Sequence, residues 1–368
     1  MDTFIKAKAR PEIFNLKPYV PGKPIEEVKR ELGIEDIIKL ASNENPLGPS
    51  PKATDAIQET LKNMHFYPDS NSYDLKKKIN ALTEQDEAGI MVGNGSDELL
   101  KLIAETFLSP GDEVILAQPT FSEYEFTATI MGAKCVKIPL NAGFTHDLEA
   151  MEKAITEKTK IIYVCNPNNP TGTVVTESEL DEFMEIVSND ILVIFDEAYI
   201  EYVNNPEFIS GLKYLNQGRN VIILRTFSKI YGLAGLRIGY GLTKPEIAGA
   251  IKRITEPFNV NLLAQIGAVA AIEDTEHVEK SRQMNNLGSE YLYKEFAAMG
   301  LNYVKTEANF IFVDTGRDCR EVFAKLLQLG VIVRTGDIFG FPTFIRVTIG
   351  SLEENNRFIA GLKKVLEG

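Results

Sequence analysis

The sequence predicts an α/β protein, with a large unit built on a mostly parallel β-sheet between helices and a smaller α+β unit after it. Between residues 55 and 250, short β-branched runs alternate with segments of helical period, which is the pattern of a parallel sheet covered on both faces. After residue 260, longer helical segments alternate with fewer strand-like runs. The length of 368 residues also suggests two or three domains.

The start of the chain is rich in proline and predicts an extended N-terminal arm, to which we assign residues 1–30. Proline fixes φ and breaks hydrogen-bond ladders, so one short helix is expected there, over residues 25–32. An arm with so little core of its own is expected to lie on another surface, and a partner subunit is one candidate. The prolines are Pro11, Pro18, Pro21, Pro24, Pro46, Pro49 and Pro51.

We assign residues 50–265 to the large α/β unit. Its predicted helices cover residues 53–62, 72–82, 98–107 and 177–187. Its predicted strands cover residues 90–92, 113–117, 135–138, 161–165, 192–195 and 221–224. Ligands of such sheets bind beyond the carboxyl ends of the strands, so the residues that directly follow these runs are candidates for the functional site.

The small α+β unit is expected to combine residues 31–49 with residues 266–368. Its predicted strands cover residues 308–314, 331–334 and 344–349. Its predicted helices cover residues 261–273, 278–299, 319–328 and 353–366. The long helices between residues 260 and 300 are expected to connect the two units.

Composition argues against several classes of function. The formal net charge of −13 disfavours nucleic acid as a partner, because backbone phosphates need a basic face. Three cysteines without CxxC spacing favour a reducing, intracellular compartment. We find no run apolar enough for a membrane span or a secretory signal, so no membrane partner and a cytoplasmic location are expected. His65, His146 and His277 form no metal-binding motif, so no metal is expected.

Two loops after predicted strands have unusual compositions. Residues 93–97 read GNGSD and precede a helix, so they form either a phosphate cradle at a helix N-terminus or a plain connection. Residues 166–172 read NPNNPTG, whose prolines and amides fix a rigid turn. This turn either contacts a ligand or serves only as a turn.

Charged residues follow two further strands. Asp196 stands directly after the run 192–195. A carboxylate buried at this position needs a cation as partner. Alternatively, Asp196 is the N-cap of a helix. The run 221–224 leads to Lys229, which has hydroxyl residues beside it and Arg237 eight residues later. This arrangement combines a possible amine nucleophile with phosphate-binding groups, although a lone lysine after a strand is usually just solvated.

These four segments, taken in order, resemble the fold-type I enzymes of the class I/II aminotransferase family, which depend on pyridoxal 5′-phosphate (PLP). The segments that carry the resemblance are GNGSD at 93–97, NPNNPTG at 166–172, DEAY at 196–199 and TFSKIYGLAGLRIGY at 226–240. The resemblance covers residues 40–350. It implies a seven-stranded sheet in the large unit, PLP as cofactor and an amino transfer between small molecules.

The resemblance also implies the catalytic roles of individual residues. Lys229 would form the internal Schiff base with PLP and then, once freed, move the proton between Cα and C4′. Asp196 would pair with the pyridine nitrogen and keep it protonated. Asn169 and Tyr199 would donate hydrogen bonds to the 3′ oxygen of the ring.

The remaining cofactor contacts follow from the same resemblance. Ser96 and Asp97 would offer backbone N–H groups to the phosphate, with the Asp97 side chain pointing away. Thr226, Ser228 and Arg237 would complete the phosphate site, with Arg237 as the charged partner.

Two aromatic residues complete the expected cofactor site. Phe121 would stack on the cofactor ring, unless it is simply a core residue. Tyr67 matches a position that reaches the phosphate of the neighbouring subunit's cofactor, which would require a homodimer.

Three further segments resemble the subfamily that acts on histidinol phosphate, with 2-oxoglutarate as acceptor and glutamate as product, in histidine biosynthesis. They are PYVPG at 18–22, LASNENP at 40–46 and EPFNVN at 256–261. By this resemblance, Arg346 binds the α-carboxylate of glutamate, and Arg334 and Arg346 bind the phosphate, helped by Tyr19 and Asn43. Arginine suits both anions because its planar fork makes two parallel hydrogen bonds.

Three other functions remain open at this point. The first is an aromatic amino-acid aminotransferase that accepts phenylalanine or tyrosine. The second is a PLP-dependent decarboxylase of a phosphorylated amino acid. The third is a non-enzymatic PLP-binding regulatory module, which the acidic charge disfavours.

Overall fold

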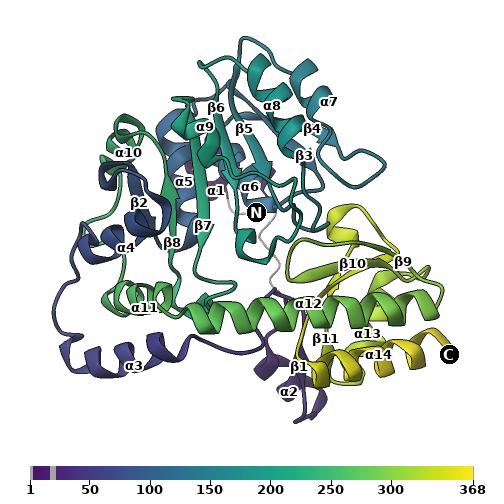
Figure 1. The fold of residues 1–368 in the computed structure, drawn as a ribbon. Coiled ribbons are helices and arrows are strands. Elements are labelled where there is room, and N and C mark those ends of the chain that lie inside the picture. The colour runs from purple at the N-terminus through teal and green to yellow at the C-terminus, as the bar shows by residue number, and fades with distance from the viewer. Residues whose placement is uncertain (1–2, 17–21, 368) are drawn as a thin grey trace.

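The computed structural model describes residues 3–16 and 22–367. It consists of a large α/β part around a seven-stranded sheet and a smaller part that holds a four-stranded and a two-stranded sheet. Figure 1 shows the two parts side by side, with the long helix α12 (Thr275–Ala298) extending from the first part along the second.

The seven-stranded sheet has the order β2-β8-β7-β6-β5-β3-β4. Strands β4, β3, β5, β6 and β7 pair in parallel, and β8 pairs antiparallel with both of its neighbours. The six predicted strands are confirmed, whereas β8 was not predicted. The bounds are Ile90–Gly93 for β2, Glu113–Gln118 for β3, Lys134–Pro139 for β4, Thr159–Cys165 for β5, Leu192–Asp196 for β6, Val221–Thr226 for β7 and Gly239–Leu242 for β8.

Helices cover both faces of this sheet (Figure 1), and each face has its own apolar core. The four predicted helices form, and α8 begins at a capping box in which Thr176 and Glu179 satisfy each other's backbone N–H groups. Helices α6, α7, α9 and α10 were not predicted, because they are short. The bounds are α3 Pro51–Thr60, α4 Tyr73–Thr83, α5 Gly95–Phe107, α6 Ser122–Ile130, α7 Leu148–Lys153, α8 Glu177–Ile186, α9 Leu212–Asn216, α10 Pro245–Lys252 and α11 Leu262–Ile272.

The smaller part contains a four-stranded antiparallel sheet of order β12-β13-β10-β9 and a parallel pair, β1 with β11. Because β1 pairs with β11, the segment 31–49 lies with the C-terminal residues, which supports the proposed grouping. The expected strand at 331–334 divides between the two sheets. The bounds are β1 Ile38–Lys39, β9 Asn302–Val304, β10 Phe310–Asp314, β11 Val331–Ile332, β12 Arg334–Thr335, β13 Phe344–Thr348, α13 Cys319–Gln328 and α14 Leu352–Glu367.

The described parts of the N-terminal arm contact this chain itself. The predicted helix α2 (Ile25–Leu32) is confirmed, and its Val28 is buried against Ala41 and Ile332. The expectation of a single helix in the arm is wrong, because Thr3–Lys8 form a further short helix, α1. Nearer the start, Arg10 Nη2 donates a hydrogen bond of 2.6 Å to the carbonyl of Ile130, at the end of α6. Over the residues described, no helix has the length and apolar character needed to cross a membrane.

Candidate active site

A cavity of about 270 Å³ opens at the carboxyl ends of β5, β6 and β7, between the two parts of the chain. This is the position that the fold predicts for a ligand site. The sequence-predicted residues that line it are Asn43, Ser96, Asp97, Phe121, Asn169, Asp196, Tyr199, Thr226, Ser228, Lys229, Arg237, Arg334 and Arg346. Parallel strands therefore bring together loops that are far apart in the sequence.

Asp196, the last residue of β6, is a buried carboxylate at the floor of the cavity, with 3% of its surface exposed. Tyr124 Oη donates a hydrogen bond of 2.7 Å to Oδ2, and the backbone N–H of Ala198 donates to Oδ1 at 3.1 Å. Burial raises the pKa of Asp196 to about 6, and these two hydrogen bonds limit the rise. The charge of Asp196 therefore depends on the balance between its burial and the hydrogen bonds that it accepts.

Tyr124 was not identified from the sequence. It lies on α6, three residues after Phe121, which is the extended residue directly before the helix. Its ring stacks on Tyr163 at 4.5 Å and meets Phe121 edge to face at 5.6 Å. No motif marks this tyrosine, and only the fold brings its hydroxyl to Asp196.

Lys229 follows β7 and points into the same cavity. Its Nζ donates a hydrogen bond of 3.2 Å to the carbonyl of Ser42. Burial and the nearby Arg346 guanidinium lower the pKa of Lys229 to about 8. The amine can therefore both lose and regain a proton near neutral pH.

Arg237 lies at the N-terminus of α5, where Gly95 has a φ of +79° and begins the helix. A Cβ atom on Gly95 would lie 2.8 Å from Arg237 Nη2, but it is the positive φ, which residues with a side chain rarely adopt, that makes this position favour glycine. Free N–H groups of a helix N-terminus beside a guanidinium form an anion site. Thr226 and Ser228 line the same cavity, and Thr226 Oγ1 accepts a hydrogen bond of 3.0 Å from the backbone N–H of Ser228.

The expectation that the Asp97 side chain points away from this site is wrong. Asp97 Oδ2 lies 3.0 Å from Arg237 Nη2, in an ion pair in which both side chains are about half exposed. The carboxylate is drawn toward the guanidinium because it is the nearest opposite charge at the start of α5.

The other side of the cavity is formed by arginines of the small part. Arg346 Nη1 donates to Asn169 Oδ1 at 2.6 Å, and Nη2 donates to the carbonyl of Ala41 at 2.7 Å. Arg334 is the direct cross-strand partner of Arg346 in the β12–β13 pair, so both side chains lie on one face of that sheet. Asn43 Nδ2 donates a hydrogen bond of 3.0 Å to Tyr199 Oη.

The two remaining predicted site residues are tyrosines. Tyr67 is 79% exposed and stacks on Phe258, with 4.3 Å between ring centroids. It does not belong to the described lining of the cavity in a single chain. Tyr19 lies outside the described residues.

Sequence reasoning also missed lining residues of other kinds. Glu44, within the LASNENP segment, lines the cavity and accepts a bond of 2.6 Å from Lys39 Nζ. Cys165, which pairs in register with Asp196 across β5 and β6, also lines it. Ser42 contributes its carbonyl, which no side-chain pattern can signal.

Comparisons with known proteins agree with this geometry. The family model described as aminotransferase class I and II matches residues 35–362. A histidinol-phosphate aminotransferase from Moorella thermoacetica is 58% identical over 98% of this chain and 93% of its own length. Another from Caldicellulosiruptor saccharolyticus is 50% identical over 97% of this chain and 99% of its own length.

A solved structure is similar over almost the whole fold. It is the histidinol-phosphate aminotransferase from Sinorhizobium meliloti in complex with pyridoxal-5′-phosphate. The TM-score is 0.91, the identity is 26%, and the match covers 98% of both chains.

Proposed function

The chain belongs to the aminotransferase class I and II family, and from this premise we propose that it transfers the amino group of L-histidinol phosphate to 2-oxoglutarate. The products are imidazole acetol phosphate and L-glutamate, which places the protein in histidine biosynthesis. Relatives at 58% and 50% identity over nearly the full length support this substrate. The observation that carries the proposal is one cavity that combines Lys229 and Asp196 with the facing arginines Arg334 and Arg346.

The residues of the cavity fit PLP as the cofactor. Lys229 offers an amine of lowered pKa, Asp196 offers a buried acid for a ring nitrogen, and Arg237 with the N-terminus of α5 offers an anion site for a phosphate. When bound, PLP supplies an aldehyde that condenses with amines and a ring that withdraws electrons.

The chain's own residues then have separate tasks. Lys229 Nζ would take a proton from the substrate Cα and deliver it to C4′ of the cofactor, which a pKa of about 8 permits. Asp196 would hold a proton on the ring nitrogen with its carboxylate. Tyr199 and Asn169 follow β6 and β5 and would bind the 3′ oxygen of the ring. Asn43 donates a hydrogen bond to Tyr199, and Arg346 donates one to Asn169.

Tyr124→Phe is expected to move the acid limb of the kcat–pH profile to higher pH. The hydrogen bond from Tyr124 stabilises the ionised form of Asp196, so its loss raises the carboxyl pKa, and Asp196 loses its charge at a higher pH. The shift should be about one to two pH units, from the 1.5–3 kcal/mol of a hydrogen bond to a charged group. Rate measurements from pH 5 to 9 test this.

The control is Tyr163→Phe. It removes a buried hydroxyl from the ring that stacks on Tyr124 but leaves the hydrogen bond to Asp196 in place. It should keep the wild-type profile. An unchanged acid limb in Tyr124→Phe would contradict the proposed role.

Arg334→Ala is expected to lower kcat/KM for histidinol phosphate more than for glutamate. A phosphate bears more charge than a carboxylate and engages both facing arginines, whereas Arg346 retains the α-carboxylate contact. The expected loss is about 1.5–3 kcal/mol per charged hydrogen bond, or roughly 10- to 150-fold. Arg320→Ala, an exposed arginine of α13, should leave both substrates unaffected. Equal losses for the two substrates would argue against phosphate binding by Arg334.

Substrate choice decides between the proposed function and its alternatives. We would compare kcat/KM for L-histidinol phosphate with that for L-phenylalanine and L-tyrosine, with 2-oxoglutarate as acceptor. A preference of about 100-fold, or 2.7 kcal/mol, for histidinol phosphate supports the proposal. A comparable rate with the aromatic amino acids would make the protein an aromatic aminotransferase. Release of CO₂ without glutamate formation would instead indicate a decarboxylase.

We also propose a cytoplasmic homodimer with shared active sites. The stacked pair Tyr67 and Phe258 is exposed, and Phe66 and Met64 beside it are 64% and 60% exposed, which is unusual for large apolar side chains. A second copy would cover this surface and bring Tyr67 to its cofactor phosphate. The cysteines Cys135, Cys165 and Cys319 are free, which supports a reducing compartment. Sedimentation of a monomer at assay concentration would overturn the dimer.

A further inference from the structure

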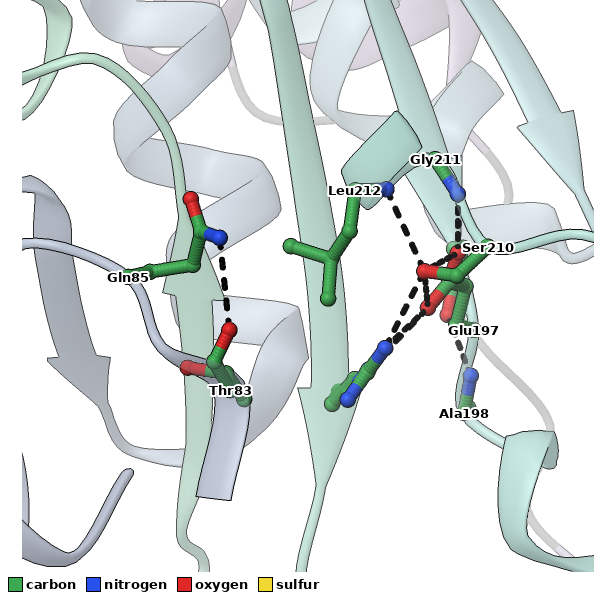
Figure 2. A network of polar contacts seen from close by, with 9 residues as sticks. Thr83, Gln85, Glu197, Ala198, Ser210, Gly211 and Leu212 are labelled. Carbon is green, nitrogen blue, oxygen red and sulfur yellow. Dashed lines mark hydrogen bonds and ion pairs between the residues drawn. The ribbon is translucent and has the colours of Figure 1, made fainter. Parts of the chain in front are cut away.

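A buried ion pair lies between the carboxyl ends of β6 and β7. Arg225 Nη2 and Nε lie 2.8 and 3.0 Å from Glu197 Oε2, and the two side chains are only 10% and 1% exposed. Glu197 Oε1 also accepts hydrogen bonds from Ser210 Oγ at 2.8 Å and from the backbone N–H of Gly211 at 2.7 Å. Figure 2 shows Ser210 and Gly211 converging on the Glu197 carboxylate. The charge of Glu197 is therefore fully matched by donors.

This pair lies on the face of the sheet opposite to the cavity. Side chains alternate between the faces of a strand, so Arg225 projects away from Thr226, which lines the cavity. The same alternation separates Glu197 from its neighbour Asp196. The core clusters show the same separation, because the apolar side chains on the two faces of β6 and β7 belong to different clusters. The cluster on the Arg225 face includes Val193, Phe195, Val221 and Ile223.

Two tyrosines from the segments that carry the other cofactor residues lie near Arg225. Tyr231, two residues after Lys229, and Tyr240, three residues after Arg237, both pack against Phe227. Burial raises the pKa of Tyr240 to about 12, and the charge of Arg225 opposes that rise. The segments that carry Lys229 and Arg237 therefore also place a tyrosine each near Arg225.

We propose that Glu197 and Arg225 are positioning residues that clamp β6 to β7 and so fix Asp196 relative to Thr226 and Lys229 for cofactor binding. A buried ion pair is weak evidence of a contribution to stability, because apolar residues of similar volume often serve equally well. Its directional bonds, in contrast, fix the relative position of two strand ends. A cofactor held at its ring nitrogen by one strand and at its phosphate by the next is sensitive to that distance. The inference rests on PLP binding in the proposed function, but not on the identity of the amino donor.

The test compares Glu197→Gln and Ser210→Ala with a matched control, Glu113→Gln. Glu113 is also a buried glutamate of this sheet. Its carboxylate accepts a hydrogen bond of 2.8 Å from Lys134 Nζ and one of 2.7 Å from Thr156 Oγ1. It begins β3, so it lies at the amino ends of the strands, away from the cavity. Four quantities would be measured on each holoenzyme: the PLP dissociation constant by equilibrium dialysis, kcat, KM for 2-oxoglutarate, and the urea midpoint of unfolding.

Glu197→Gln should raise the PLP dissociation constant and lower kcat by roughly 10- to 100-fold each, with an unchanged KM. Ser210→Ala removes one donor and should raise the dissociation constant about 3- to 10-fold. Glu113→Gln should change only the urea midpoint. If both site variants match Glu113→Gln in PLP affinity and kcat, the pair is merely structural and the proposal is overturned. Ser210→Ala alone decides the outcome if Glu197→Gln does not fold. A wild-type protein that does not retain PLP would instead overturn the proposed function itself.

Discussion

Lys229→Ala is expected to abolish covalent attachment of PLP and reduce transamination by roughly 10²- to 10⁴-fold from the loss of acid–base catalysis alone. Lys229 Nζ lies in the cavity with a pKa of about 8, so a substantial fraction of it is neutral just above neutral pH and can act both as a nucleophile and as a base. Borohydride reduction of the holoenzyme followed by mass spectrometry would locate the attached cofactor. Rapid mixing with the amino donor would measure the rate.

The control for this experiment is Lys325→Ala, which removes an exposed lysine from α13. It should retain the cofactor and full activity. Added methylamine distinguishes a chemical from a structural defect, because a small amine that enters the emptied space can restore part of the proton transfer. Wild-type turnover in Lys229→Ala, or reduced PLP on another lysine, would refute the assignment of Lys229.

The sequence predicted those parts of the fold that carry a strong apolar pattern. Strands β3, β5, β6 and β7 are runs of buried β-branched and other apolar residues and were readily found. Strand β8 reads Gly-Tyr-Gly-Leu and was missed, because glycine lowers strand propensity. A Cβ atom on Gly239 would lie 2.7 Å from the backbone nitrogen of Ser96, so the close approach to the start of α5 requires the glycine. Pairing with β2 and β7 on its two sides then forms the strand despite its propensity.

The candidate site could be predicted where function depends on residues within one motif. Asn169, Lys229 and Arg237 lie in short segments whose order along the chain is distinctive. Tyr124 reaches Asp196 across 72 positions of sequence, and no local pattern records such a contact. The orientation of the Asp97 side chain depends on a guanidinium 140 positions away. The role of Tyr67 depends on a second copy of the chain and stays a prediction.

Asp196→Asn is expected to lower kcat by about 10²- to 10⁴-fold, because removing one partner of a buried charged pair costs about 3–5 kcal/mol. An amide of the same shape can accept from the Ala198 N–H through Oδ1 and donate through Nδ2 to the Tyr124 hydroxyl, but it carries no charge to hold a proton on the ring nitrogen. The electron withdrawal that the ring supplies weakens as a result. The dissociation constant for PLP should also rise. Half-reaction rates with histidinol phosphate, measured with saturating cofactor, would test the prediction.

A cofactor with a methylated ring nitrogen separates the charge of Asp196 from its packing. That nitrogen keeps its positive charge without a proton, so the methylated cofactor should restore part of the lost rate in Asp196→Asn and bring no gain to the wild type. Asp181→Asn, which removes a distant carboxylate bonded to Lys213 and Tyr214, should behave as wild type with either cofactor. If the methylated cofactor brings no gain in Asp196→Asn although it binds, the defect lies in the geometry of the site. The Asp196 carboxylate would then act by positioning the ring and not through its charge. Its burial beside Tyr124 would serve packing alone.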